Sequence, residues 1–331
     1  MDEHDVIGIG SPLLDITFEV TESFLEENGL KKGVMHLITR DQSKELLKKL
    51  ENHPVKISPG GSSANTLAGI SYLGGKSIFL GKIGNDSHGK TYEQKTKEEG
   101  VVSMLSKHPD EITGHAITFI TPDYERTFAT HLGASLYFRK ENIPEDKIKD
   151  SKILHLEGYQ IGDVELRKAV YHAANIAKEN KILVSLDLSD AGLVKANLKE
   201  FVDFIKEYVD IVFANESEAI ALTGKKPEEA LLEISKLCKI AIVKLGGNGS
   251  IIRTNNITYK IPPYLTKIMN TNGAGDMYSA AFLYGIVNDW DIDKAGKVAS
   301  YSASLVVGRP EARYGPELKQ KVDDFISKNK L

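Results

Sequence analysis

Short apolar runs rich in β-branched residues alternate with longer amphipathic stretches along the second half of the chain. The runs occupy Ile153–Leu156, Ile182–Leu188, Ile211–Ala214 and Ile240–Lys244, and helical patterns such as Val164–Lys178 separate them. Runs that are apolar on both faces are typical of a parallel sheet covered by helices on each side. The pattern therefore predicts an α/β fold with a mainly parallel central sheet. Ligands bind at the carboxyl ends of strands in such sheets, where the sequence places Asp187, Asn215 and Gly246.

Two segments interrupt this rhythm. Asp15–Thr39 and His115–Thr130 each contain two strand-like runs, and neither segment has an obvious crossover helix. We interpret them as a small β-sheet lid over the cleft, formed by residues 15–39 and 114–130. The large α/β domain then comprises residues 1–14, 40–113 and 131–331.

The heptapeptide Asn270–Asp276 runs straight into an apolar helical stretch. Small and turn-forming residues at a helix start expose backbone N–H groups, and the helix dipole adds positive charge, so the loop suits an anion. Asp276 lies at its rim, where a carboxylate could accept a proton from a substrate hydroxyl. This pairing suggests phosphoryl transfer. The alternative is a glycine-rich loop whose aspartate only caps a helix.

Composition sets broad limits. The chain has 331 residues, of which 41% are hydrophobic and 27% charged, as in an ordinary soluble enzyme. A net charge of −4 offers no basic field for nucleic acid. The one cysteine, Cys238, excludes an internal disulfide and fits a reducing cytoplasm. We expect no secretion signal at the acidic N-terminus and no membrane span, because no apolar run approaches the roughly 18 residues that a bilayer requires.

A rival motif is present at Gly84–Thr91, which satisfies the Walker A pattern between a strand-like run and a helical run. Ile182–Leu186 followed by Asp187 could even act as its metal-binding strand. However, Asp86 would place a negative charge in the phosphate cradle. We therefore favour a structural turn, with Lys90 on a surface helix. The pair Gly8 and Gly10 does not form a dinucleotide fingerprint, because Leu13 occupies the third glycine position.

Six segments in a fixed order resemble the ribokinase-like (PfkB) family of carbohydrate and nucleoside kinases, over nearly the whole chain. They are Gly8–Asp15, Gly60–Asn65, Gly81–Gly89, Asn215–Glu218, Lys244–Ser250 and Asn270–Asp276. Within the family, Ser11–Asp15 and Glu125–Ala134 look most like adenosine kinases. The resemblance implies a three-layer α/β/α domain with a small β-sheet lid.

The resemblance also implies roles for individual residues. Asp276 would be the general base, with the backbone of Gly273, Ala274 and Gly275 as the anion hole and Arg126 as a lid arginine that reaches the phosphates. Substrate would contact Ser11, Leu13, Asp15, Gly60, Gly61, Asn65, Phe128, Tyr159 and Asn272. ATP would contact Asn215, Lys244, Gly246, Gly247 and Gly249, and Glu218 would order Mg²⁺ through water. Without the resemblance, Asp15 is equally a turn residue and Asn65 a first-turn helix residue.

Two departures limit the resemblance. The family usually begins its anion-hole motif with an aspartate that contributes to a monovalent-cation site, and this chain has Asn270, so the resemblance does not extend to potassium activation. Adenosine kinases often carry asparagine just before the proline, where this chain has Ser11. A shorter side chain there predicts a looser hold on the base edge.

We therefore expect an ATP- and Mg²⁺-dependent kinase that phosphorylates the 5′-hydroxyl of a nucleoside, with adenosine first. The base would pack against apolar residues of the lid and strand ends, for which Leu13, Leu37, Phe119, Phe128 and Tyr159 are the candidates. One alternative is a sugar kinase that acts on ribose or fructose. Another is a ligand-sensing protein that has lost the chemistry, although the intact Asp276 argues against it. Relatives include monomers and dimers, so either state fits.

Overall fold

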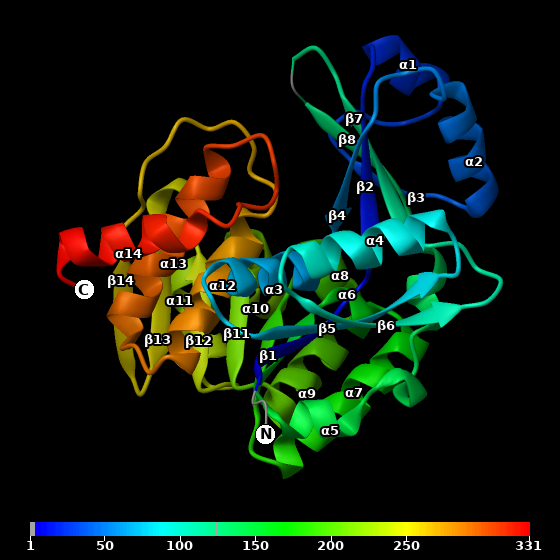
Figure 1. Ribbon diagram of the computed structural model, residues 1–331. Helices are drawn as coiled ribbons and strands as arrows, with labels where there is room; N and C mark the ends of the chain where they lie inside the picture. Colours follow the sequence, from blue (N-terminus) through cyan, green and yellow to red (C-terminus); the bar gives the residue numbers. More distant parts are fainter. Residues whose placement is uncertain (1–3, 124) are drawn as a thin grey trace.

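Among residues 4–123 and 125–331, the part of the chain that the computed structural model describes, nine strands form the central sheet (Figure 1). Their spatial order is β14-β13-β12-β11-β10-β9-β1-β5-β6. The strands from β12 to β6 in this order run parallel, and β13 and β14 form an antiparallel edge. The strands are β1 (His4–Ile9), β5 (Ser77–Gly84), β6 (Val102–His108), β9 (Ser151–Glu157), β10 (Leu183–Asp187), β11 (Ile211–Asn215), β12 (Ile240–Lys244), β13 (Ser250–Thr254) and β14 (Ile257–Ile261).

Helices cover both faces of this sheet, which confirms the predicted three-layer α/β/α fold (Figure 1). One layer contains α3 (Ser62–Tyr72), α4 (Ser87–Glu98), α12 (Ala274–Val287), α13 (Ile292–Val307) and α14 (Leu318–Asn329). The other contains α5 (Glu145–Lys149), α6 (Tyr159–Gly162), α7 (Val164–Glu179), α8 (Ala191–Ala196), α9 (Leu198–Tyr208), α10 (Glu216–Thr223) and α11 (Pro227–Ile234). Within the described residues, no helix is both long and apolar enough to cross a membrane.

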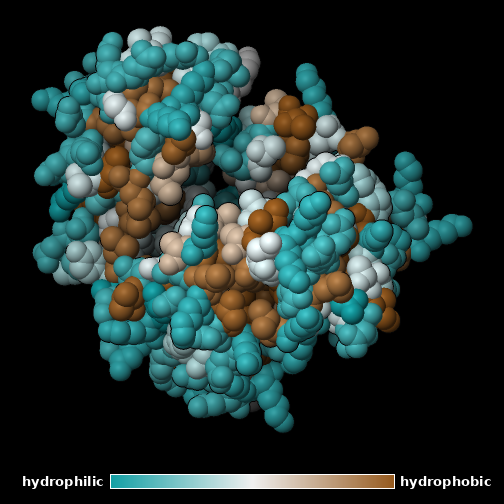
Figure 2. All heavy atoms as spheres, turned by 180° about the vertical axis from the view of Figure 1, so that it is seen from behind, coloured by the Kyte–Doolittle hydropathy of each residue, from teal (hydrophilic) through white to brown (hydrophobic). Residues whose placement is uncertain are grey.

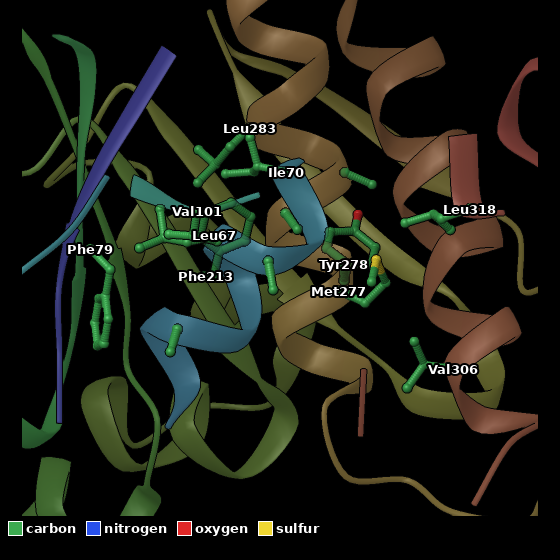
Figure 3. Close-up of a cluster of buried hydrophobic side chains, with 14 of the residues drawn as sticks. Leu67, Ile70, Phe79, Val101, Phe213, Met277, Tyr278, Leu283, Val306 and Leu318 are labelled. Atoms are coloured by element: carbon green, nitrogen blue, oxygen red, sulfur yellow. The ribbon is translucent and has the colours of Figure 1, made fainter. Parts of the chain in front are cut away.

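Helices α3 and α12 pack closely against each other, and this contact determines the shape of the site. Leu67 and Ile70 of α3 meet Met277 and Leu283 of α12 in a buried apolar cluster (Figure 3). A Cβ at Gly69 would lie 2.7 Å from the Ala280 Cβ, so glycine permits the close approach. The N-terminal ends of the two helices consequently lie side by side.

A second, five-stranded sheet stands over the carboxyl ends of the central strands (Figure 1). Its order is β3-β8-β7-β2-β4, and α1 (Glu22–Glu27) and α2 (Arg40–Lys49) flank it. The strands are β2 (Leu13–Glu19), β3 (Met35–Leu37), β4 (Lys56–Gly60), β7 (His115–Ile120) and β8 (Arg126–His131).

The small sheet includes one strand that the expected lid boundaries leave out, which is β4. The sequence analysis placed residues 40–113 in the large domain, yet β4 pairs antiparallel with β2 and brings Gly60 opposite Leu13. Its sequence, Lys-Ile-Ser-Pro-Gly, contains proline and glycine and carries no clear strand pattern, and proline is tolerated here because β4 is an edge strand. Residues 1–3 and 124, which the expected boundaries include, lie outside the described residues.

Candidate active site

A cleft of about 2240 Å³ lies between the small sheet and the carboxyl ends of the central strands. Seen from behind, it is a hollow between the two parts of the molecule, and apolar side chains line much of its wall (Figure 2). Every site residue that the sequence predicts lines this cleft except Gly60 and Phe119, both of which are buried. The structure therefore brings together residues that are up to 265 positions apart, from Ser11 to Asp276.

Asp276 occupies the first turn of α12 and faces the start of α3. Its carboxylate accepts a hydrogen bond from the Ser62 hydroxyl and another from the Asn65 amide, each 2.7 Å long. Burial raises the pKa of Asp276 to about 6, and the two donors oppose that rise. The carboxylate is thus held between polar groups, carries its charge at neutral pH and has a pKa suited to a general base.

The loop before α12 presents backbone N–H groups to the cleft. Gly273 caps the helix with φ of +77°, and a Cβ there would lie 2.0 Å from the Ala312 carbonyl oxygen, so only glycine fits. The first four N–H groups of a helix have no intrahelical acceptor, and here they belong to residues 273–276, of which Ala274 donates to the Thr271 carbonyl at 3.3 Å. The Lys244 ammonium lies 3.2 Å from the Cβ position of Gly275. Backbone dipoles and this ammonium together favour an anion at the loop.

Asp15 lies on β2 on the opposite wall of the cleft. Burial raises its pKa to about 6, although the nearby guanidinium groups of Arg313 and Arg126 lower it. The antiparallel pairing of β2 with β4 brings Gly60 so close that a Cβ would lie 2.7 Å from an Asp15 carboxylate oxygen. Gly61 has φ of +95°, and a Cβ there would lie 2.3 Å from the Ser11 carbonyl oxygen. Both glycines therefore have a steric reason to be present.

Glu157, at the end of β9, organises the part of the cleft that contains Ser11. One carboxylate oxygen accepts from the Ser11 backbone N–H at 2.9 Å and from Gln160, and the other accepts from the Ser63 N–H at 2.8 Å. Gln160 also donates to the Ser11 hydroxyl at 3.3 Å. Ser11 is consequently held in place, and its own hydroxyl proton is available to a ligand.

Two buried carboxylates and a lysine meet near the ends of β10, β11 and β12. The Lys244 ammonium lies 2.8 Å from Asp187, and it keeps the pKa of Asp187 low even though burial alone would raise it. Burial and the neighbouring Asp187 raise the pKa of Glu218 to about 7. Glu218 also accepts hydrogen bonds from the backbone and side-chain amides of Asn215, which caps α10.

A cation would relieve the repulsion between Glu218 and Asp187, so this corner fits Mg²⁺ chemically. Within the described residues no group of three or more acidic, histidine or cysteine side chains could hold a metal by itself. Mg²⁺ commonly keeps several waters and is bound by one or two carboxylates together with substrate phosphates, so Glu218 and Asp187 are the carboxylates that would hold it here.

The turn after β12 borders the cleft at the expected nucleotide end. No heavy atom lies within 4 Å of a Cβ built at Gly246 or Gly247, so the backbone there is open to a close ligand. Gly249 is different, because its Cβ would lie 2.1 Å from the Ile261 carbonyl oxygen. Its glycine is required by the fold.

Asn270 holds the anion loop to the irregular segment 308–317. Its amide nitrogen donates to the Pro310 carbonyl at 2.9 Å, and its oxygen accepts from the Asn272 N–H at 3.0 Å. The side chain is nearly buried. The amide therefore places a donor against this carbonyl and fixes the position of Asn272 at the cleft.

The small sheet supplies both apolar and charged groups to the cleft. Leu13 and Phe128 line it, together with the half-exposed Tyr159 at the strand end. Arg126 donates to the same Pro310 carbonyl at 3.2 Å, so its guanidinium spans the cleft. The expectation for Phe119 was wrong, because alternation along β7 turns it to the other face, where it is fully buried 5.7 Å from the Phe24 ring.

The Walker-like segment forms a closed structural turn. Asp86 caps α4 by accepting from the Gly89 N–H at 2.7 Å, and it also accepts from the backbone and hydroxyl of Thr113. Its carboxylate thus occupies the position that a phosphate would take. Lys90 is exposed and does not line the cleft. The local geometry agrees with a structural turn.

Two residues at the site were missed by the sequence analysis. Glu157 ends β9, so the strand-end argument that selected Asp187 could have found it. Arg313 lies in the segment 308–317, which has no periodic pattern. Its guanidinium reaches Asn65, Glu99 and the Gly60 carbonyl, and no sequence signal marked it.

Comparison with known proteins agrees with this arrangement. The model of the pfkB family of carbohydrate kinases matches residues 34–319. A curated 5-dehydro-2-deoxygluconokinase of Listeria monocytogenes is 30% identical over 262 residues, which cover 76% of this chain and 81% of that protein. A probable sugar kinase from Rhizobium etli CFN 42 superposes with a TM-score of 0.90 at 30% identity, over 98% of this chain and 99% of that one. An adenosine kinase from Sinorhizobium meliloti superposes with a TM-score of 0.89 at 31% identity, with the same coverage.

Proposed function

Because the chain belongs to the pfkB family of carbohydrate kinases, it is an ATP-dependent kinase of a sugar or nucleoside, and we propose that its acceptor is the 5′-hydroxyl of a nucleoside, adenosine first. The observation that carries the choice of acceptor is the apolar wall of the cleft. Met35 is 49% exposed and Leu37 66% exposed, and both line the cleft with Leu13 and Phe128. A purine face covers such a wall far better than a sugar does, at roughly 25 cal/mol for each Å² of apolar surface buried.

Asp15 and Asn65 supply the polar groups that a ribose requires. A carboxylate can accept hydrogen bonds from two vicinal hydroxyls, and the Asn65 amide nitrogen already points at Asp276 over 2.7 Å. We assign Asp15 to the diol and Asn65 to the neighbourhood of the reacting hydroxyl. Rigid placement of this hydroxyl in line with the γ-phosphate then provides much of the rate enhancement.

Proton transfer is assigned to Asp276. Its carboxylate accepts the proton of the 5′-hydroxyl as that oxygen bonds to the γ-phosphorus and the bond to the β-phosphate oxygen breaks, with ADP leaving. The N–H groups of residues 273–275 and the Lys244 ammonium stabilise the charge on the transferred group. Arg126 reaches into the cleft from the small sheet and suits the phosphate oxygens.

Mg²⁺ would be held through water by Glu218 and Asn215 and would neutralise the phosphate charge. Gly246 and Gly247 leave room for the nucleotide to approach the backbone. Potassium is not part of the proposal. The carboxylate that contributes to a monovalent-cation site in the family is replaced here by the Asn270 amide, whose nitrogen donates to the Pro310 carbonyl.

A panel of acceptors with ATP and Mg²⁺ tests the proposal. We expect kcat/KM to be highest for adenosine, to remain measurable for inosine, guanosine and cytidine because Ser11 is short, and to be poor for ribose and fructose. A Leu37→Ser variant removes apolar surface that no strand packing requires, since Leu37 is 66% exposed. It should raise KM for adenosine without changing KM for ATP. A sugar that exceeds every nucleoside in kcat/KM would overturn the choice of acceptor.

A second candidate is an acidic sugar, because the curated relative phosphorylates a gluconate derivative by name. Arg126 could hold its carboxylate, since the guanidinium faces the cleft and donates to a neutral backbone carbonyl, that of Pro310. Including 5-dehydro-2-deoxygluconate in the panel distinguishes the two. Arg126→Lys should then raise KM for the acidic sugar if that is the acceptor, and should lower kcat if the guanidinium meets the phosphates.

A further inference from the structure

Arg313 reaches the catalytic end of the cleft from the segment 308–317. Its side chain is 9% exposed, and its three nitrogens contact three separate elements. The Nε donates to the Asn65 Oδ1 of α3 at 2.7 Å, one terminal nitrogen donates to the Gly60 carbonyl of β4 at 3.4 Å, and the other forms an ion pair with Glu99 after α4. Such an arrangement fixes the guanidinium plane.

The contact with Asn65 decides which way the amide of Asn65 faces. A guanidinium has donors only, so the oxygen of Asn65 must point to Arg313. The amide nitrogen must then point away from it, and it donates to the Asp276 carboxylate at 2.7 Å. If the amide turned over, its oxygen would face that carboxylate and repel it.

The ion pair with Glu99 shows that Arg313 does not act mainly as a charge for the ligand. Glu99 is itself largely buried, with 15% of its side chain exposed, and it neutralises the guanidinium. Arg313 also contacts the Tyr92 hydroxyl, Asn65 and the Gly60 carbonyl, which lies opposite Leu13 and beside Asp15. Its charge lowers the pKa of the nearby Asp15, whereas its influence on Asp276 passes through the geometry of Asn65.

We infer that Arg313 is a positioning residue for phosphoryl transfer, which acts by holding the Asn65 amide with its nitrogen toward Asp276. The inference rests on the proposed role of Asp276 as the base. It assigns no substrate contact to Arg313. Without the guanidinium, Asn65 is free to turn and Asp276 loses one of its two side-chain donors.

Two measurements on Arg313→Met separate positioning from mere structural support. We expect kcat to fall on the order of 10²-fold with KM for ATP unchanged, because a small misplacement at the reacting atoms is sufficient for such a loss. We also expect the acidic limb of the kcat profile to move to higher pH, since Asn65 lowers the pKa of Asp276. The other charged or titratable groups that face Asp276 are Asp187, Lys244, Glu157 and Tyr159, and the substitution leaves all four in place. Loss of the guanidinium also raises the pKa of Asp15, so the shift is assigned to Asp276 only if it persists in an Asp15→Asn background.

Arg309→Met is the matched control. Arg309 lies on the same segment, forms ion pairs with Glu311 and Glu317, and does not line the cleft. Its substitution should leave kcat and the pH profile as in the wild type. An equal loss in both variants would overturn the inference, because disturbance of the segment alone would then explain it.

Chemical rescue and a double-mutant cycle keep the test decisive if Arg313→Met folds poorly. Millimolar guanidinium should restore at least tenfold of the lost kcat in Arg313→Ala, whereas the same concentration of sodium should not. Adding Arg313→Met to Asn65→Ala should cost less than threefold in kcat, because the amide to be positioned is already gone. Full additivity or an absence of rescue would contradict the inference.

Asp276→Asn, measured alongside, identifies which idea has failed. If Asp276→Asn keeps its activity, the proposed base is wrong. If it is inactive while the Arg313 variants match the wild type, only the positioning role is wrong.

Discussion

The ammonium of Lys244 lies 2.8 Å from the carboxylate of Asp187, beside the glycine loop at the start of α12. Both side chains are largely buried, at 14% and 6% exposed. The positive charge of Lys244 balances the charge of two carboxylates, because Asp187 and Glu218 both raise the pKa of Lys244. Lys244 is therefore both a structural partner of Asp187 and the source of the ammonium group beside the anion loop.

Lys244→Met should destabilise the fold and weaken ATP binding. Removal of one partner from a buried ion pair leaves an uncompensated charge and typically costs about 3–5 kcal/mol. Urea unfolding measures this loss, and KM for ATP should rise in the same variant. The control is Lys97→Met, which breaks an exposed helical pair with Glu93 and should change stability by no more than the measurement error. Similar losses in both variants would contradict the assignment.

The central sheet could be predicted because its parallel strands are buried on both faces and so read as continuous apolar runs. The small sheet was harder to delimit, since β4 carries Pro59 and Gly60 and pairs only along one edge. Candidate site residues with a local motif, such as Asp276 and Asn215, could be proposed from the sequence, and both line the cleft. Arg313 was not, because its role depends on a contact with Asn65, 248 positions away, and nothing in the sequence around it is periodic.

The enzyme should lose activity as the pH falls through about 6. Burial raises the pKa of both Asp15 and Asp276 to about 6, and each must be charged to accept a hydrogen bond or a proton. The kcat/KM profile should therefore show an acidic limb near that pH, whose apparent pKa values belong to the interacting groups together. An acidic limb near pH 4, the ordinary range of a carboxyl group, would contradict the raised pKa values of Asp15 and Asp276.

The same shifts make a prediction for stability. A carboxyl group whose folded-state pKa exceeds its unfolded value of 3.8 stabilises the fold fully below that value, and the contribution is lost as the pH rises through about 6. Asp15→Asn lacks this titration. The free energy of unfolding of the wild type should thus fall relative to that of Asp15→Asn between pH 4 and pH 7. A constant difference across this range would contradict the raised pKa.

Gly60→Ala and Gly247→Ala should separate the two ends of the cleft. A Cβ at Gly60 would press on Asp15, so KM for the nucleoside should rise while KM for ATP stays the same. A Cβ at Gly247 meets no protein atom, so the fold should be unaffected and KM for ATP should rise. Steady-state kinetics with each substrate varied in turn measure both KM values. If KM for ATP rose in Gly60→Ala and KM for the nucleoside rose in Gly247→Ala, or if neither KM changed, the two ends of the cleft would be wrongly assigned.

The Walker-like turn should prove structural. Lys90→Ala should leave KM for ATP and kcat close to the wild type, because Lys90 is exposed and outside the cleft. Asp86→Ala should lower stability by about 1–2 kcal/mol through loss of the helix cap, again with KM for ATP unchanged. A large drop in ATP affinity in Lys90→Ala would revive the P-loop interpretation.

The central claim is that Asp276 takes the proton of a nucleoside hydroxyl in this cleft, and Asp276→Asn tests it most directly. The amide keeps the shape and cannot accept the proton. With ATP, Mg²⁺ and adenosine, the wild type should form AMP and the variant should lose about 10²–10⁴-fold in kcat, while titration calorimetry shows nearly unchanged affinity for adenosine and ATP. Less than a tenfold loss, with chemistry shown to be rate-limiting, or no AMP from the wild type, would contradict the account.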